Sequence, residues 1–238
     1  RWVHWCYGGT DDVSFPYLYF GDAVLRSREG VQQGDPLGPL LFSLVIQEVV
    51  LAIRSQCPDL DLNKWYLDDG VIGGRNKLVS RALEVIQTVG PPLGMELNLS
   101  KNEIVKFTTQ ADCFPAEFKR FYRNFELLGA PIGDEVHCTE FIVNYTKKRV
   151  QHIMGALMLI QDPQVVHFLL RLCCAFCRVV HLTRTVPFHF AVSAWEFFDD
   201  AVVNACSKGL GVIFSPEALE QLALPFSRGG LGLRKASD

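Results

Sequence analysis

The sequence predicts an α+β protein, with a mixed half of strands and helices over residues 1–136 and an all-α half over residues 137–238. In the first half, short runs of β-branched and aromatic residues alternate with turns that contain Gly and Asp, which is typical of paired strands. In the second half, apolar residues recur at helical spacing over three long stretches. Hydrophobic residues make up 49% of the chain and charged residues 21%, as in soluble globular proteins.

The first elements are a hairpin, a loop and a long helix. The stretch YLYFGDAVLRS (17–27) predicts two strands joined by Gly21-Asp22, because Gly at the first central position suits a two-residue turn. Three Gly and two Pro make residues 30–39 a loop. The near-continuous apolar run at 40–56 predicts a helix that is buried on most sides, with Pro39 near its first turn.

The remainder of the first half alternates strands and one helix. In WYLDDGVIGG (65–74), two strand-forming runs flank Asp-Asp-Gly, which we expect to form the turn of a hairpin. A helix is expected over 76–90, with Asn76 as its cap and Pro91-Pro92 after its end. Two short strands around a polar turn are expected at 95–107, and another strand and turn at 125–133.

The second half is expected to contain three long helices and a short one. The long helices lie within 139–160, 164–182 and 189–210, and are interrupted near Pro163 and Pro187. Charged residues within 164–182 indicate a buried helix rather than a membrane span. A short helix follows at 215–223, where Ser is placed to cap it and Pro takes the first helical position. The tail LPFSRGGLGLRKASD is rich in Gly and basic residues.

Charge and cysteine content narrow the class of protein. The net charge is −3 and the isoelectric point is about 6.1, which argues mildly against a free-standing, tight binder of nucleic acid. Local basic groups persist, as in FKRFYR (118–123), where aromatic residues between cations suit base stacking and phosphate contact. The alternative is that FKRFYR belongs to an ordinary solvent-exposed face. The eight Cys are scattered and no export signal is expected, so reduced thiols and an intracellular protein are predicted.

The adjacent carboxylates Asp68 and Asp69 are the first candidate for chemistry. Paired carboxylates on a stiff hairpin tip are oxygen ligands that suit hard cations such as Mg²⁺. In two-metal phosphoryl transfer, carboxylates hold two cations about 4 Å apart. The alternative is that Asp-Asp-Gly only makes a turn, because these residue types are common in turns of any function.

Four motifs in order resemble the reverse transcriptase domain of non-LTR retrotransposons. QGDPLGP (33–39) resembles the motif of that family called motif B, and YLDD (66–69) resembles its Tyr-x-Asp-Asp box. LNLSK (97–101) resembles the following segment with its Lys, and LLGAPIG (127–133) resembles the primer-grip hairpin. The resemblance spans nearly the whole chain, and includes the tail LPFSRGGLGLR.

The resemblance implies a polymerase palm, an antiparallel sheet with packed helices, over 1–136, and an all-α thumb with a Gly-rich basic tail over 137–238. It implies that Asp68 and Asp69 are catalytic metal ligands for two Mg²⁺, with Mn²⁺ as an alternative. Lys101 would offset charge on the leaving pyrophosphate, although a solvated turn lysine is the alternative. The implied nucleotide- and template-binding residues are Gln33, Gly34, Asp35, Pro36 and Tyr66, and the implied primer-grip residues are Leu128 and Gly129.

The sequence departs from the family at two places. Many relatives carry Ser at the position of Gly38, so a helix-capping hydroxyl is absent here. The first metal-binding Asp of the family lies in a strand before the first hairpin, and no residue of this sequence fits that role. We therefore expect a chain that lacks the fingers and first palm strand, and that does not polymerise by itself.

A zinc site is a rival prediction for the second half. Cys174 and Cys177 are two residues apart, and His181 and His189 follow. Against this, both Cys lie in an apolar helical run, and Cys is a common small core residue.

We therefore expect an RNA-directed DNA polymerase fragment of a retroelement. The resemblance implies an RNA template, a DNA primer and deoxynucleoside triphosphates as partners, no membrane, and a nuclear location. The alternative function is a non-catalytic nucleic-acid-binding or structural remnant of such a polymerase.

Overall fold

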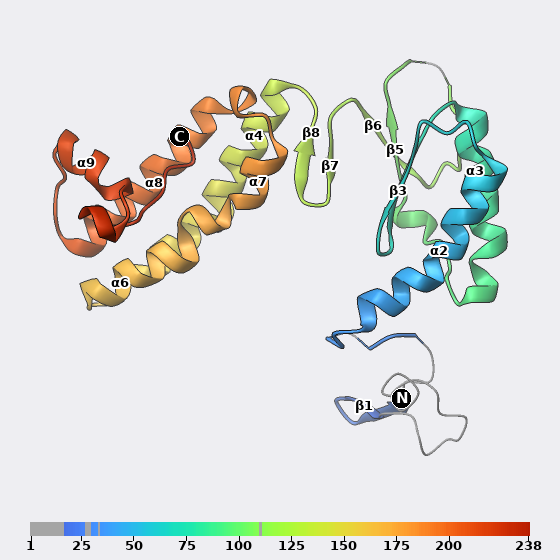
Figure 1. The fold of residues 1–238 in the computed structure, drawn as a ribbon, viewed down its shortest axis with the longest axis horizontal. Helices are drawn as coiled ribbons and strands as arrows, with labels where there is room; N and C mark the ends of the chain where they lie inside the picture. The colour runs from blue at the N-terminus through green and yellow to red at the C-terminus, as the bar shows by residue number, and fades with distance from the viewer. Residues whose placement is uncertain (1–16, 27–29, 33, 110) are drawn as a thin grey trace. The chain divides into compact units, whose positions relative to one another are not determined.

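The computed structural model describes residues 17–26, 30–32, 34–109 and 111–238 (Figure 1). The chain forms two compact units, one within residues 1–102 and 110–119, the other of residues 103–109 and 120–238. Both helices and strands are present, and the described strands pair two by two in four separate small sheets. The predicted boundary between palm and thumb portions at 136/137 stays a prediction.

The first unit begins with the predicted hairpin. Strand β1 (Tyr17–Phe20) pairs antiparallel with β2 (Ala23–Arg26), and Gly21 at the turn has φ +57°. The long helix α2 (Gly38–Gln56) follows, with Pro39 in its first turn as predicted.

The expectation that the long helix α2 would be buried on most sides is wrong. Its buried face comprises Ile46, Val49, Val50 and Ile53. The other side exposes apolar residues, among them Leu40, Leu44 and Leu51. Near-continuous hydrophobicity in the sequence therefore did not mean burial all round, because only one side of the helix meets the core of this unit.

Helix α2 packs against helix α3 (Asn76–Val89) and against a hairpin of β3 (Leu62–Tyr66) and β4 (Asp69–Gly73). Figure 1 shows the two helices side by side with this hairpin. The buried cluster between them contains Val49, Ile53, Cys57, Ala82 and Val85. The short helices η1 (Pro91–Leu93) and η2 (Leu99–Lys101) follow α3.

Two local predictions in this region are wrong. The N-cap of α3 is Arg75, without a side-chain cap, and the side chain of Asn76 donates instead to the carbonyl of Ala111 at 3.4 Å. Within 95–107, the first expected strand is absent. Asn98 accepts a hydrogen bond from the backbone N–H of Ser100 and so starts η2 in its place.

The second unit contains two small sheets and a helical bundle. Strand β5 (Glu103–Lys106) pairs with β6 (Lys119–Tyr122), and β7 (Phe125–Leu127) forms a hairpin with β8 (Ala130–Ile132). The helical elements are α4 (Glu135–Tyr145), the π-helix η3 (Thr146–Val150), α5 (Gln151–Leu157), α6 (Pro163–Leu169), the π-helix η4 (Leu170–Cys174), η5 (Phe176–Arg178), α7 (Val180–Thr185), η6 (Phe188–Phe190), α8 (Val192–Leu210), α9 (Pro216–Ala223) and η7 (Phe226–Arg228).

The helices of the second unit agree with the sequence predictions, with one exception. Ser215 caps α9 by accepting from the N–H of Ala218, as expected. The predicted single helix over 164–182 is wrong, because Ala175 leaves the helical region with φ −87° and ψ −134°. The chain therefore passes from α6 and η4 into η5 and α7 through a break.

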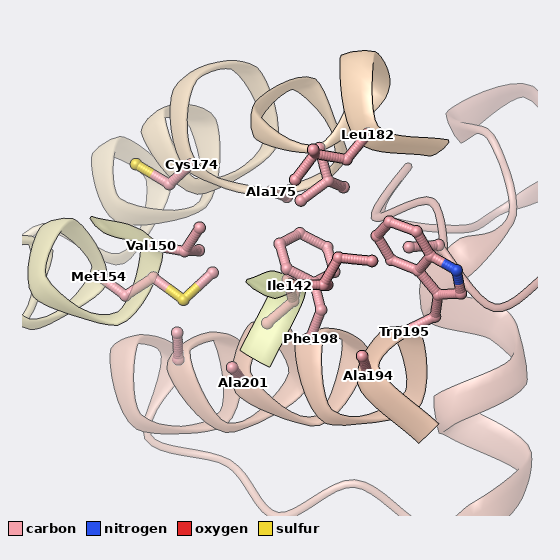
Figure 2. Packing of buried hydrophobic residues seen from close by; sticks show 14 of the residues in the cluster. Ile142, Val150, Met154, Cys174, Ala175, Leu182, Ala194, Trp195, Phe198 and Ala201 are labelled. Carbon is pink, nitrogen blue, oxygen red and sulfur yellow. The ribbon is translucent and has the colours of Figure 1, made fainter. Parts of the chain in front are cut away.

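The core of the second unit lies around α8. The largest fully buried side chains are Trp195 and Phe198 from α8, with Ile142 from α4 and Leu170 from η4. Figure 2 shows Phe198, Ile142, Val150 and Ala201 as parts of one buried cluster. Burial of these apolar surfaces is the main stabilising contribution to the bundle.

By length and composition alone, two of the described helical stretches, Gly38–Gln56 and Pro163–Thr185, are apolar enough to cross a membrane. The same test is passed by core helices of soluble proteins. Each stretch supplies residues to a buried cluster, and the second is broken at Ala175. The finding is therefore weak evidence for a membrane span.

Candidate functional site

The β3–β4 hairpin places the two candidate metal ligands at its tip. Tyr66 pairs with Asp69 across the hairpin, so Leu67 and Asp68 form the two-residue turn. The expected Asp-Asp-Gly turn is therefore wrong by one position, and Asp69 is the first residue of β4. Leu67 has φ +54°, a conformation that L-residues other than Asn and Asp rarely adopt. Such backbone strain costs of order 1–3 kcal/mol and clusters at functional sites.

One face of this hairpin is fixed to the helices. Trp65 and Ile72 pack against the buried cluster of α2 and α3. Trp65 lies opposite Gly70 in the register, and a Cβ on Gly70 would come within 2.6 Å of the indole ring. The indole therefore covers Gly70, and only glycine fits this position without movement of the ring. The indole N–H also donates to Asn63 Oδ1 at 2.8 Å.

The opposite face of the hairpin is open. Side chains alternate between the two faces of a strand, so Lys64 and Tyr66 lie on the face opposite to Trp65. Asp69, the cross-strand partner of Tyr66, lies on that same face. All three are exposed, and Asp68 in the turn is exposed as well.

The two carboxylates fit a hard cation in donor type. Exposed carboxylate oxygens on a fixed hairpin are ligands that Mg²⁺ accepts, with water and phosphate oxygens completing its shell. Among the residues that the structure describes, no group of three or more His, Cys, Asp or Glu is arranged to hold a metal ion. Asp68 and Asp69 thus form an acidic pair that no third carboxylate of the described chain completes.

The loop before α2 is held by its own carboxylate. Asp35 Oδ1 accepts from the N–H of Leu37 at 2.8 Å, and the Asp35 carbonyl accepts from the N–H of Gly38 at 3.0 Å. Gly34 has φ +94°, which requires glycine. Pro36 is exposed next to them. Gln33, the remaining residue predicted in this loop, lies outside the described residues, and the predicted nucleotide contact of the loop stays a prediction.

The backbone at Gly38 lies close to the loop before the helix. Gly38 is buried at the start of α2, and a Cβ there would lie 3.3 Å from the carbonyl oxygen of Gln32. A Ser in this position would press on that carbonyl. Asp35 closes the turn before the helix in its place.

Lys101 ends the short helix η2 and is exposed. Its backbone N–H donates to the carbonyl of Asn98 at 3.1 Å, so the fold of this turn is fixed while the ammonium group remains in solvent.

The predicted primer-grip residues occupy the turn of the β7–β8 hairpin in the second unit. Leu128 and Gly129 both have positive φ, +49° and +76°, as in a type I′ turn. The Leu128 side chain is 48% exposed. Nε2 of His181, on α7, lies 2.9 Å from the Leu128 carbonyl oxygen. Because a carbonyl only accepts, this nitrogen carries the proton and donates.

The base of the same hairpin is tied to α4. Asn124 Nδ2 donates to Asp134 Oδ2 at 2.9 Å, and the Asp134 N–H donates back to Asn124 Oδ1 at 3.0 Å. Asp134 also caps α4 by accepting from the His137 N–H. The Asn124 hydrogen bond and the His137 backbone hydrogen bond hold the pKa of the Asp134 carboxyl below its usual value. The imidazole of His137 lies 3.3 Å from the Phe125 carbonyl oxygen.

Sequence reasoning missed these supporting residues. An Asp just before a helical pattern is a signal for a cap, so Asp134 was within reach. His181 was not, because it is 53 positions from Leu128 and no local pattern links them.

The rival zinc site gains no support. Cys174 is buried in the core, whereas Cys177 is exposed in η5. His181 binds the Leu128 carbonyl, and the ring of His189 meets Phe190 edge-on at 4.7 Å.

Comparison with known proteins adds one observation. No protein-family model and no solved structure matches the chain. The retrotransposable element SLACS 132 kDa protein of Trypanosoma brucei gambiense is 23% identical over 216 residues. The chain resembles a retrotransposon protein. The aligned region covers 90% of this chain but only 18% of that relative. The similarity supports a retroelement origin.

Proposed function

We propose that this chain is the palm and thumb portion of a retroelement reverse transcriptase. In the complete enzyme, the primer 3′-hydroxyl attacks a deoxynucleoside triphosphate opposite an RNA template. The observation that carries the proposal is the β3–β4 hairpin, fixed on one face through Trp65 and Gly70, with exposed Asp68 and Asp69 at its tip. The similarity to a retrotransposon protein supports it independently.

Each predicted site residue has a role in this proposal. Asp68 and Asp69 bind Mg²⁺ or Mn²⁺, which supplies Lewis acid stabilisation of the phosphoryl oxygens when bound. Tyr66 lies beside Asp69 on the open face and contacts the nucleotide. Lys101 offsets negative charge on the leaving pyrophosphate. Residues 33–36 contact the incoming nucleotide and template, and the turn at Leu128 and Gly129 contacts the primer.

A specific observation favours a second candidate function. In the described part of the chain no third carboxylate joins Asp68 and Asp69. A non-catalytic remnant that retains nucleic-acid binding or a structural role does not need one. In either case we propose a nuclear protein of retroelement origin that acts away from membranes.

Metal binding to the hairpin tests the proposal. Manganese binding to the whole chain is measured by electron paramagnetic resonance for the wild type and for Asp68→Asn with Asp69→Asn. Loss of two charged ligands is expected to weaken Mn²⁺ binding about tenfold or more. The matched control is Asp59→Asn with Asp61→Asn, which removes two exposed carboxylates from the same unit. Equal affinity in all three proteins would contradict a metal site at the hairpin.

Primer extension separates the two candidate functions. We expect no RNA-templated DNA synthesis by the isolated chain with Mg²⁺ or Mn²⁺, because the acidic pair has no third carboxylate among its described residues. Synthesis that Asp69→Asn abolishes would show that the chain is itself catalytic. Manganese binding without synthesis, followed by synthesis in a longer polypeptide of the same element, would support the fragment of an enzyme over the remnant.

A further inference from the structure

A cavity in the second unit is lined by none of the candidate residues described above. Its volume is about 470 Å³, within the range of roughly 300–1,000 Å³ found for small-molecule sites. Its walls come from η5, α7, η6, α8, α9 and the tail. The residues that matter for a ligand are Phe176, Phe188, Trp195, Arg234, Lys235 and Asp238.

The tail segment that lines the cavity is anchored on both sides of its two basic residues. Before them, the N–H of Leu233 donates to the carbonyl of Leu222 at 3.0 Å. After them, the Asp199 carboxylate accepts from the N–H groups of Ala236 and Ser237 at 2.8 and 3.0 Å. Leu233 and Ala236 are both buried. The backbone that carries the two cations is therefore fixed at the cavity wall.

The cations lie next to aromatic surface. The guanidinium carbon of Arg234 lies 4.9 Å from the ring centroid of Phe176, which holds this charge at the wall through a cation–π contact. Phe188 is 48% exposed and also lines the cavity. Aromatic faces with adjacent cations bind groups that are planar at one end and anionic at the other.

Trp195 supplies an unused hydrogen-bond donor. The residue is only 1% exposed and lines the cavity. Among the described residues, none accepts a hydrogen bond from its indole N–H. The indole nitrogen is not fully buried. In Figure 2 the indole nitrogen lies on the side of the ring away from Phe198. A donor with no protein partner at a cavity wall favours a ligand that carries an acceptor.

We propose that this cavity binds a single nucleotide. The base lies against Phe188 and accepts a hydrogen bond from the Trp195 N–H. The phosphate pairs with Arg234 and Lys235. The carboxylate of Asp238 repels a phosphate, so it belongs at the base end, where it accepts from an N–H group. The site does not use the hairpin of Asp68 and Asp69, so it goes beyond the proposed polymerase function.

Two sources share this chemistry. One is a free nucleoside monophosphate, and the other is the unpaired terminal nucleotide of a nucleic-acid strand. The affinity of the whole chain is measured by isothermal titration calorimetry for each of the four nucleoside monophosphates, and for oligonucleotides with a 5′-phosphate or a free 3′ end. Adenosine and inorganic phosphate are titrated separately, because each lacks one half of the proposed ligand.

Two double variants that remove cations test whether the nucleotide binds in the cavity. Arg234→Gln with Lys235→Gln is expected to weaken nucleotide binding about tenfold or more. The matched control is Lys208→Gln with Arg228→Gln, which removes two exposed cations of the same unit outside the cavity. Trp195→Phe keeps an aromatic ring and removes the donor, and is expected to weaken binding about threefold to tenfold.

The outcomes decide the proposal without reference to metal binding. Binding of a mononucleotide or of a strand end that the cavity pair weakens and the control pair does not would support it. Equal losses in the two double variants, tighter binding of an acidic peptide, or no binding by the wild type would overturn it. If Trp195→Phe fails to fold, the two charge pairs still decide. If the hairpin variants lose Mn²⁺ binding but still bind the nucleotide, the result supports a nucleotide site that is independent of the hairpin.

Discussion

The indole ring of Trp65 covers Gly70 across the β3–β4 hairpin, and a single carbon added to Gly70 would lie 2.6 Å from that ring. The contact fixes the register that places Asp68 in the turn and Asp69 on the open face. It also joins the acidic tip to the cluster of α2 and α3, because Trp65 packs against that cluster.

We expect Gly70→Ala to lower the free energy of unfolding by about 1–3 kcal/mol, because the indole must leave its place in the core to make room. Equilibrium unfolding in urea measures the change. In a Trp65→Leu background the same substitution is expected to cost less, since the two residues are in contact. The control Gly155→Ala meets open space within α5 and is expected to be neutral or stabilising. An equal cost in both backgrounds would contradict the contact.

The hydrogen bond from His181 is expected to hold the β7–β8 turn. His181→Phe keeps the ring and removes the donor, so a loss of about 1 kcal/mol of local stability is expected at the turn. Hydrogen exchange of the backbone amides of the paired strands β7 and β8 measures it. His181→Gln retains a donor in reach and is expected to restore protection. The control is His152→Phe, at an exposed position on α5. A similar loss of protection of the β7–β8 hairpin in this control would contradict the role of His181.

The lowered pKa of Asp134 gives a pH dependence with a definite sign. A carboxyl whose pKa is lower in the folded state stabilises that state above its unfolded pKa, and loses this stabilisation as pH falls through the folded pKa. Between about pH 5 and pH 2, the wild type is expected to lose stability more steeply than Asp134→Asn, which keeps a capping side chain. Urea unfolding at several pH values tests this, with Asp200→Asn on α8 as the exposed control. If the free energy of unfolding falls equally with pH in wild type and Asp134→Asn, the hydrogen bonds from Asn124 and His137 do not lower the pKa of Asp134.

The thiols are expected to differ in reactivity according to burial. Burial raises the pKa of Cys206 to about 11, so little thiolate forms near neutral pH. Cys113, Cys173 and Cys177 are exposed. At pH 8 iodoacetamide is expected to alkylate these three well before Cys206, as followed by mass spectrometry of peptides. In denaturing urea all are expected to react alike, and early labelling of Cys206 in the native protein would be inconsistent with its burial.

Local signals in the sequence predicted the elements that local chemistry controls. Gly21 marked the first hairpin, Pro39 the start of α2, and Ser215 the cap of α9, because each of these residues acts within a few positions. The same local signals predicted the helices and strands around the candidate site, except for the strand expected before Asn98. The carboxylate pair was found because adjacent charges at an expected turn are conspicuous in a sequence.

Tertiary contacts decided what the sequence could not. The turn of the β3–β4 hairpin lies one residue earlier than expected, in the register that sets Gly70 opposite Trp65. The helix predicted through Ala175 breaks there, although the apolar spacing continues. The partnership of His181 with Leu128 joins two distant positions.

The chain passes between the two compact units three times, since residues 103–109 belong to the second unit and 110–119 return to the first. No single truncation point therefore separates one complete unit from the other. A fragment that ends at 102 loses 110–119 from its own unit, and a fragment that begins at 120 loses the strand β5. Experiments that separate the proposed metal site from the proposed nucleotide site must accordingly use point substitutions, because deletions would damage both units.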